Sequence, residues 1–399
     1  MIRLDLNNSI NLGTHSKNTI IRFGVDEISY NNFYWGFINK NWPAIITNIT
    51  TDWECSRTWI SNKNGAHIYI NFVYLKNKIK DCLVPVTNCT DKSVSIESFY
   101  NYLDKWEKSI QSRNSDEDSI HQYLKDWHIK EVLESYKFYK VPKLFFSDWL
   151  NEFLIENHRN DFRFVYMGPK NTWTPFHVDV FGSFSWSANV YGCKKWILLP
   201  PGEEFKLLDQ YKKLPYKVSE ESLRKSNVKF FVVHQQQNEA IFVPSGWYHQ
   251  VYNVTDTISV NHNWFNAVNI KYIWSNISDN LRKVMIEISD LRISQNFNEQ
   301  CQQLLHLDFG LNIFEFLEIL CFIANGRLLL LKRNQENSFI KYIQCQSSHM
   351  FYFNDFHIYY DLKTINTILK TMIQDKFVHN CSRLYNKCIL FICRINQYS

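Results

Sequence analysis

The residues with the clearest chemical potential are two histidines and a carboxylate. His177 and Asp179 lie two residues apart, and His249 follows a later turn, Pro244-Ser245-Gly246. Two imidazoles and one carboxylate can bind one face of an Fe(II) ion and leave the remaining positions open for an oxo acid and dioxygen. We therefore expect His177, Asp179 and His249 to hold one iron ion.

A second pair of residues could bind an acidic cosubstrate beside this metal. A 2-oxo acid chelates iron through its carboxylate and its ketone, so the carboxylate at its far end needs a fixed cation. Lys194 can provide that cation, and the hydroxyl of Thr174 can act as a second hydrogen-bond donor. Because an unpaired buried lysine is costly, we expect this pair to bind a diacid or to stay hydrated.

Each residue also has a plainer interpretation. A single histidine is at least as often structural as metal-binding, and Lys194 alone would usually be a solvated strand lysine. His262 competes with His249 as the third ligand. Strand alternation places His262 on the opposite face from Asn261 and Asn263, so only one of these two sets can face the metal.

The sequence contains another His-x-Asp pair, His306 and Asp308. With 13 histidines in the chain, about one such pair is expected by chance. Asp308 lies close to Gly310, where we expect it to cap a helix and His306 to lie at the surface. The setting of His177, which enters a β-rich region and precedes a second histidine, favours it as the metal site.

The region around these residues has the pattern of a β-barrel or sandwich. Between residues 162 and 264, short β-rich runs alternate with turns that contain glycine and proline. Residues i and i+2 of a strand share a face, so His177 and Asp179 can both point into a barrel.

The flanking regions have different patterns. Residues 68–74 predict a strand, and residues 311–331 predict a buried helix, since acidic and basic side chains interrupt that apolar run. We expect four parts: a loose lead-in at 1–20, a mixed α/β part at 21–150 that packs on the barrel, the barrel at 151–270, and a helical region at 271–399.

The composition restricts the class of protein. Hydrophobic residues make up 45% of the chain, and a net charge of +5 without basic runs argues against direct nucleic-acid binding. The 10 cysteines form no Cys-x-x-Cys pair, so we expect reduced thiols and no zinc knuckle. The N-terminus lacks an apolar signal region. We therefore expect a cytoplasmic protein without a membrane partner, with a nuclear pool as the alternative.

These residues lie in motifs that resemble a known family. From about residue 28 to about residue 330, the chain is similar to JmjC-domain proteins, the jumonji group of 2-oxoglutarate oxygenases. Within that group it most resembles the lysyl hydroxylase of the eukaryotic translation release factor. The motifs are Tyr123-Leu124-Lys125-Asp126-Trp127-His128, Met167-Gly168-Pro169, His177-Val178-Asp179, Ser183-Phe184-Ser185-Trp186-Ser187, Gly192-Cys193-Lys194-Lys195-Trp196, Pro244-Ser245-Gly246-Trp247-Tyr248-His249 and Ser259-Val260-Asn261-His262-Asn263-Trp264.

The resemblance implies a fold and a set of ligands. The fold is a mainly β core, a double-stranded β-helix or jelly roll of the cupin-like JmjC type, with flanking α-helices at both ends. Fe(II) would be bound by the triad, and 2-oxoglutarate would be held by Lys194 and Thr174, with dioxygen as co-reactant. Ser187 stands where related enzymes have an asparagine, and its side chain is shorter, so the family's contact with the cosubstrate does not carry over directly to this position. The further pocket residues implied are Tyr123, Ser187, Asn261 and Asn263.

The resemblance also implies a reaction. Oxidative decarboxylation of 2-oxoglutarate to succinate and carbon dioxide would be coupled to hydroxylation of a lysine side-chain carbon in the release factor, which promotes translation termination. The alternatives are a JmjC demethylase or a hydroxylase of another protein at arginine or lysine, and an inactive JmjC scaffold. A metal-dependent isomerase or sugar-binding cupin would not require Lys194.

Overall fold

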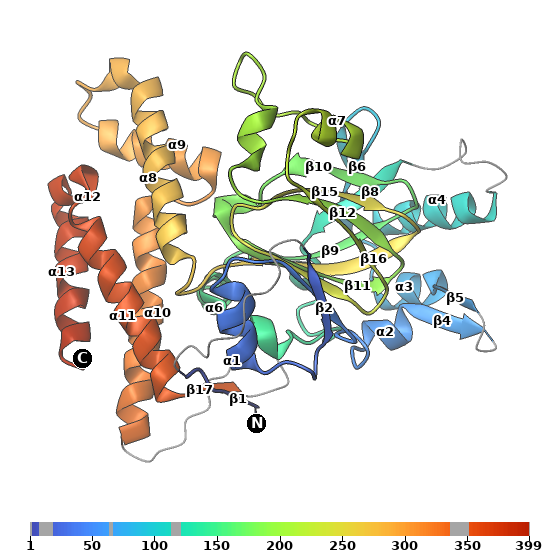
Figure 1. The fold of residues 1–399 in the computed structure, drawn as a ribbon, viewed down its shortest axis with the longest axis horizontal. Helices are drawn as coiled ribbons and strands as arrows, with labels where there is room; N and C mark the ends of the chain where they lie inside the picture. The colour runs from blue at the N-terminus through green and yellow to red at the C-terminus, as the bar shows by residue number, and fades with distance from the viewer. Residues whose placement is uncertain (1, 8–18, 64–66, 113–120, 336–350, 399) are drawn as a thin grey trace.

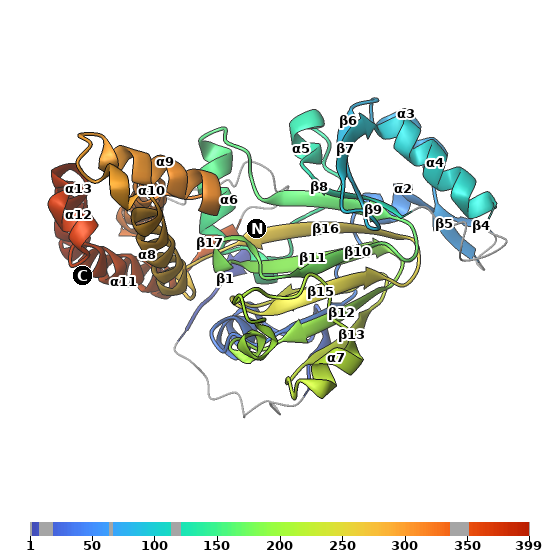
Figure 2. The same ribbon diagram turned by 90° about the horizontal axis from the view of Figure 1, so that it is seen from above.

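Two facing β-sheets form a barrel at the centre of the molecule, and a helical region lies on one side of it (Figures 1 and 2). The computed structural model describes residues 2–7, 19–63, 67–112, 121–335 and 351–398. The arrangement confirms the predicted jelly-roll core with flanking helices.

The larger sheet has nine strands and is antiparallel except where β2 pairs with β3. Strands of the N-terminal part extend it at both edges, so residues 21–150 contribute to the barrel's own sheet instead of forming a separate layer. In spatial order the strands are β2 (Ile21–Gly24), β3 (Ala44–Thr47), β14 (Ala240–Val243), β11 (Phe184–Tyr191), β16 (Thr257–Trp264), β9 (Arg163–Gly168), β8 (Gln122–Trp127), β6 (Leu83–Asn88) and β7 (Val94–Ser98).

The smaller sheet closes the barrel and carries both metal-site histidines. Its four antiparallel strands are β10 (Trp173–His177), β15 (Tyr248–Asn253), β12 (Lys194–Leu199) and β13 (Phe231–Gln235). His177 at the end of β10 is the register partner of His249 on β15. The pairing of these two strands therefore brings the histidines together.

Alternation along β16 decides which of its side chains enter the barrel. Ile258, Val260 and Trp264 belong to the hydrophobic core outside the cavity. Asn261 and Asn263 have the opposite parity and line the cavity between the sheets. The strand thus has a polar face with Asn261 and Asn263 and a mainly apolar face that His262 interrupts.

Helices surround the barrel, and α8 to α13 form the helical region (Figure 1). Two small two-stranded sheets, β4 (Ile60–Lys63) with β5 (His67–Ile70) and β1 (Ile2–Leu4) with β17 (Phe351–Phe353), complete the strands. The helices are α1 (Tyr30–Phe33), α2 (Cys55–Thr58), α3 (Phe72–Lys78), α4 (Phe99–Gln111), α5 (Ile129–Val132), α6 (Trp149–Glu156), α7 (Glu220–Lys225), α8 (Ile270–Glu287), α9 (Phe297–Phe309), α10 (Ile313–Gln335), α11 (Asp355–Met372), α12 (Lys376–Asn380) and α13 (Ser382–Asn396).

Two predictions about local structure are wrong. The run 68–74 is not one strand, because Asn71 accepts a hydrogen bond from the backbone of Tyr74 and so caps the start of α3. Residues 2–4 are not loose, because they pair in parallel with β17 near the other end of the chain. The expected boundary at residue 151 falls inside α6.

Asp308 also has a different role from the predicted one. It lies in the last turn of α9, and Asn312 caps the next helix by accepting a hydrogen bond from the backbone of Glu315. His306 is exposed, as expected, and its Nδ1 lies 2.8 Å from a carboxylate oxygen of Glu315. The second His-x-Asp pair therefore has no convergent third ligand among the described residues.

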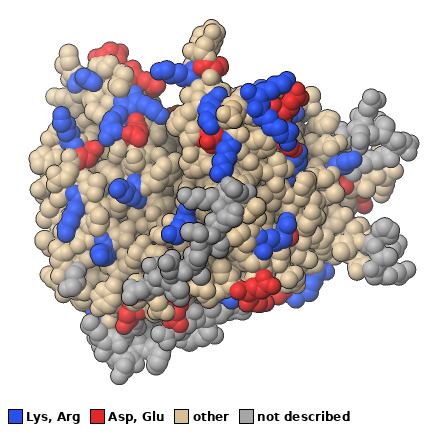
Figure 3. All heavy atoms as spheres, viewed as in Figure 1, with Lys and Arg blue, Asp and Glu red and all other residues tan. Residues whose placement is uncertain are grey.

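Surface charge, cysteine pairing and helix composition show no unusual feature in the described residues. Basic and acidic side chains are interspersed over the helices and the barrel on the face that Figure 3 shows in colour. All described cysteines are free thiols, as expected. Within the described residues, no helix has both the length and the apolar composition needed to span a membrane.

Candidate active site

The barrel brings His177, Asp179 and His249 together. Their ligand atoms all lie within 4.8 Å of one another, and the two imidazole centroids are 4.3 Å apart. Within the described part of the chain, these residues form the only His, Cys, Asp or Glu group that converges closely enough to hold a metal ion.

Backbone carbonyls fix the orientation of both imidazoles. The Nδ1 of His177 lies 2.7 Å from the carbonyl oxygen of Pro175, and the Nδ1 of His249 lies 3.0 Å from that of Trp247. A carbonyl can only accept, so each Nδ1 carries the proton and each Nε2 is left with a lone pair. Burial and the neighbouring His249 lower the pKa of His177 to about 4, so the ring is neutral near pH 7. Neutral imidazole is the form that binds a metal.

Two donors hold the carboxylate of Asp179 in place. The hydroxyl of Ser185 donates to Oδ2 at 2.7 Å, and the amide of Asn263 donates to Oδ1 at 2.9 Å. Each carboxylate oxygen has two lone pairs, so these bonds leave electron pairs free for a metal. Asn263 therefore supports a ligand and does not act as one.

Lys194 lies inside the barrel without a carboxylate partner among the described residues. Only 2% of its surface is exposed, and its Nζ donates to the hydroxyl of Ser259 at 2.6 Å. Burial lowers the pKa of Lys194 to about 7. The hydroxyl oxygens of Thr174 and Ser187 are also buried, and neither has a hydrogen-bond partner among the residues that the structure describes. Three polar groups thus face the cavity with unused hydrogen-bonding capacity.

The other predicted pocket residues lie around this group. Tyr123 is buried, and a Cβ at Gly168 would collide with its ring, so glycine is needed there. Burial raises the pKa of Tyr123, so its hydroxyl stays protonated. The amide of Asn261 donates to the hydroxyl of Ser259 at 3.1 Å. Ser259 therefore connects Asn261 to Lys194.

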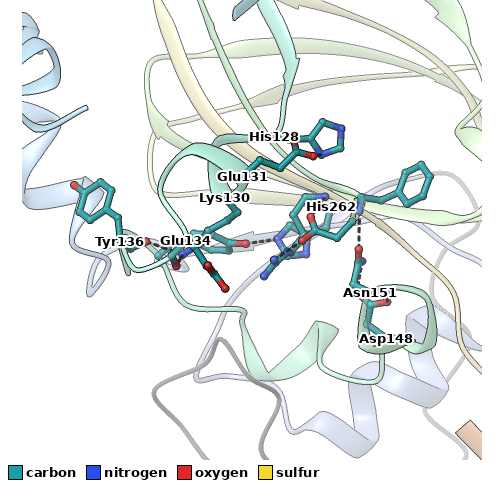
Figure 4. Close-up of polar contacts among 12 residues, drawn as sticks. His128, Lys130, Glu131, Glu134, Tyr136, Asp148, Asn151 and His262 are labelled. Atoms are coloured by element: carbon teal, nitrogen blue, oxygen red, sulfur yellow. Dashed lines mark hydrogen bonds and ion pairs between the residues drawn. The ribbon is translucent and has the colours of Figure 1, made fainter. Parts of the chain in front are cut away.

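His262 is not the third ligand. Its ring stacks on Trp186 with the centroids 4.1 Å apart, and its Nε2 lies 2.9 Å from the hydroxyl of Tyr139. Burial lowers the pKa of His262 well below its ordinary value. Figure 4 shows His262 near a group of polar residues that includes Lys130, which donates to the backbone carbonyl of Tyr136. His262 reaches the cavity wall, but its ring nitrogen is engaged by Tyr139.

Known proteins are similar in sequence to most of this chain. The family profile described as JmjC domain, hydroxylase matches residues 164–264. The chain is 43% identical over 397 residues to the 2-oxoglutarate and iron-dependent oxygenase JMJD4 homolog of Drosophila melanogaster, which covers 92% of this chain and 91% of that protein. The chain belongs to the JMJD4 family.

Two further relatives are named as an oxygenase and as a demethylase. The human 2-oxoglutarate and iron-dependent oxygenase JMJD4 is 37% identical over 319 residues, or 76% of this chain and 75% of that protein. The arginine-specific demethylase JMJ20 of Arabidopsis thaliana is 34% identical over 342 residues, or 78% and 72%. Membership of the JMJD4 family confirms the expected class, a 2-oxoglutarate-dependent dioxygenase with iron as its metal.

The residues of this JMJD4-family chain fit both an iron ion and 2-oxoglutarate. The triad offers two imidazole nitrogens and one carboxylate oxygen, the donor set of non-haem iron oxygenases. The orphaned hydroxyls of Thr174 and Ser187, together with the Lys194 ammonium, fit the far carboxylate of 2-oxoglutarate. The cavity has a volume of about 350 Å³, enough for the cosubstrate and one side chain.

A β-bulge places a further carboxylate at the mouth of the cavity. The register between β8 and β9 shifts between Leu124 and Trp127, and Asp126 has a φ of 57°. Bulges of this kind redirect side chains next to active sites. The hydroxyl of Tyr166 donates to one oxygen of Asp126, and Lys125 lies 3.4 Å from the other. About half of the Asp126 side chain remains exposed.

Four of these residues had no role assigned from the sequence: Ser185, Ser259 and Asp126, which lie in the motifs, and Tyr166. Parity along a strand could have indicated two of them, since Ser185 precedes Ser187 by two residues and Ser259 precedes Asn261 by two. The bulge that turns Asp126 toward the cavity has no comparable signal in the sequence.

Proposed function

We propose that this chain hydroxylates a lysine side-chain carbon in the eukaryotic translation release factor and so promotes translation termination. The observation that carries the substrate side is Asp126, whose carboxylate is held at the cavity mouth by Tyr166. A carboxylate fixed there can pair with the ammonium of an entering lysine. The release factor itself is proposed from the resemblance of the sequence motifs.

Different residues of the site would bind the metal and the cosubstrate. Bound together, iron and 2-oxoglutarate supply the oxidising chemistry that places one oxygen atom of O₂ in a C–H bond and converts 2-oxoglutarate to succinate and carbon dioxide. His177 and His249 each donate Nδ1–H to a backbone carbonyl, which leaves Nε2 as the atom that can bind the metal, and Asn263 fixes Asp179. Lys194 neutralises the far carboxylate of the cosubstrate, which orients its other end toward the triad.

A methylated arginine is the second candidate substrate. The relative from Arabidopsis thaliana is named an arginine-specific demethylase. A guanidinium is also a cation, and its N–H groups can donate to the same carboxylate of Asp126 in a bidentate pair. Hydroxylation of the N-methyl carbon would then release the methyl group as formaldehyde.

Mass spectrometry separates the two candidates. The purified protein is incubated with Fe(II), 2-oxoglutarate and either the recombinant release factor or a peptide with methylated arginine. We expect a release-factor lysine to gain the mass of one oxygen atom, and no change with Asp179→Ala, which removes a ligand. Loss of a methyl group from the peptide, with an unchanged release factor, would favour the second candidate.

The role of Asp126 can be tested separately through the KM for the protein substrate. In Asp126→Asn the side chain keeps its shape but loses its charge, so we expect the KM for the release factor to rise about tenfold or more. Succinate formation without a protein substrate should persist, because Asp126 does not touch the triad in the described contacts. An unchanged KM would remove Asp126 from the proposal.

The proposal also places the protein in the cytoplasm, where the release factor acts on ribosomes. Microscopy of the tagged full chain tests this placement. A wholly nuclear signal would contradict it.

A further inference from the structure

The β6–β7 hairpin extends the larger sheet beyond β8 (Figure 2). Its two faces differ in the burial of their side chains. One face is covered: Val84 and Val86 are buried in the core that includes α4. The other face is open, and three large apolar side chains on it are exposed by 62–70%. These side chains, the open face, are Leu83, Val94 and Ile96.

The strand register makes the open face continuous with the wall of the active-site cavity. Val94 on β7 is the partner of Thr87 on β6, and Thr87 is the partner of Tyr123 on β8. Register partners point to the same side of a sheet, and Tyr123 lines the cavity. Ile96, two residues after Val94, shares this side. The open face is therefore the outer part of the same surface.

The position of the open face limits what can occupy it together with the cavity. Neighbouring strands are about 4.8 Å apart, so β7 lies roughly 10 Å from β8. A small molecule in the cavity would not reach the open face, but a polypeptide whose side chain enters the cavity must lie across the surrounding surface. Large apolar side chains gathered on one exposed face are typical of a protein-binding surface.

We propose that Leu83, Val94 and Ile96 bind apolar side chains of the protein segment that flanks the target residue. This inference rests on the proposed function, since it needs a protein substrate. Asp126 at the cavity mouth and the open face then recognise different parts of one substrate. The carboxylate selects the charge of the target side chain, and the open face selects its sequence context.

A triple variant tests the open face. Leu83→Gln, Val94→Thr and Ile96→Thr remove apolar surface but keep residues that a strand tolerates. The matched control is Ile286→Gln with Leu307→Gln, which removes exposed apolar side chains from α8 and α9. We expect the KM for the release factor to rise about tenfold in the triple variant and to stay unchanged in the control, because the lost apolar contacts weaken binding. Succinate formation without protein substrate should be the same in both.

Three outcomes overturn the inference. An unchanged KM in the triple variant, with active wild-type enzyme, removes the open face from substrate binding. If the wild-type enzyme leaves the release factor unmodified, both the proposed function and this inference are contradicted. A dimer that the triple variant converts to a monomer in light scattering identifies the face as a contact between two copies. If the triple variant loses uncoupled turnover, Val94→Thr alone carries the same comparison.

Discussion

The surroundings of Lys194 make its charge depend on its ligand. Burial lowers its pKa to about 7, and Ser259 is a neutral partner that does not stabilise the ammonium as a carboxylate would. A bound carboxylate favours the protonated form. The lysine therefore takes up a proton when the cosubstrate binds above pH 7.

This coupling predicts a pH-dependent affinity for 2-oxoglutarate. Below the pKa of free Lys194 the side chain is already charged, so the KM should be nearly constant. Above about pH 7 the KM should rise by up to about tenfold per pH unit, because binding must include protonation. Succinate formation measured from pH 6 to pH 9 tests this prediction. Lys194→Met should show a high KM without the same slope, and an equal slope in both proteins would contradict it.

The support of Asp179 leads to a second prediction at this scale. Asn263→Ala removes the donor to Oδ1 of Asp179, so the affinity for Fe(II) should fall about ten- to a hundredfold. Anaerobic titration with Fe(II) measures the change. Asn261→Ala is the matched control on the same strand, because Asn261 donates to Ser259 and not to Asp179. Equal losses in both variants would mean that β16 as a whole was disturbed.

Helix α6 positions the end of β16 that carries Asn263. The amide of Asn151 donates to the carboxylate of Asp148 at 2.6 Å and to the backbone carbonyl of Asn263 at 3.0 Å. Its oxygen accepts from the backbone of Phe162 at 2.7 Å, at the start of β9. Figure 4 shows Asn151 and Asp148 in this arrangement. One side chain thus connects a helix to two strands of the barrel wall.

Asn151→Ala should therefore destabilise the barrel. Removing the side chain leaves buried donors and acceptors unpaired, which should cost about 3 kcal/mol of unfolding free energy. Urea denaturation measures the loss. Asn157→Ala at the other end of α6 loses a single bond to Phe153, so its cost should stay below about 1 kcal/mol. A similar loss in both variants would contradict the connecting role.

Some elements could be predicted from the sequence because their signal is local. The barrel strands show short β-rich runs between turns, and α8 and α10 begin where an apolar helical period begins. The triad could be predicted because His177 and Asp179 are two residues apart and His249 follows a distinctive turn, although Asp179 lies just after β10 and not on it as strand alternation had suggested. Each of these signals is carried by a few neighbouring residues, even where strand pairing joins two of them in space.

Other features depend on contacts that no local pattern encodes. Residues 68–74 favour a strand by composition, but the cap at Asn71 starts a helix there. β1 exists only through its pairing with β17, which lies more than three hundred residues later, near the far end of the chain. The turn of Asp126 into the cavity follows from a register shift against β9. These features required the whole fold.

A buried ion network joins the helical region to the barrel. Arg327 on α10 donates to Glu152 on α6 at 3.0 Å and to Asp361 on α11 at 2.7 Å, and all three side chains are buried. Burial alone would raise the pKa of Asp361, but His357 and Arg327 together hold it below its ordinary value. Asp361 therefore stabilises the fold at neutral pH, and this contribution is lost as the pH falls through its pKa.

Removing Arg327 should show how much this network contributes to the free energy of unfolding. Arg327→Met leaves the buried carboxylate of Glu152 without its cation and that of Asp361 with His357 alone, so the unfolding free energy at pH 7 should fall by about 3–5 kcal/mol. Burial then raises the pKa values of both acids, so they take up protons more readily than in the wild type, and the deficit should shrink between pH 7 and pH 5. Urea denaturation at both pH values measures the two effects. Arg159→Met, which breaks a partly exposed pair with Glu318, should cost less than about 1 kcal/mol at either pH. A deficit for Arg327→Met that does not change with pH would mean that lost packing, and not unpaired charge, causes the instability.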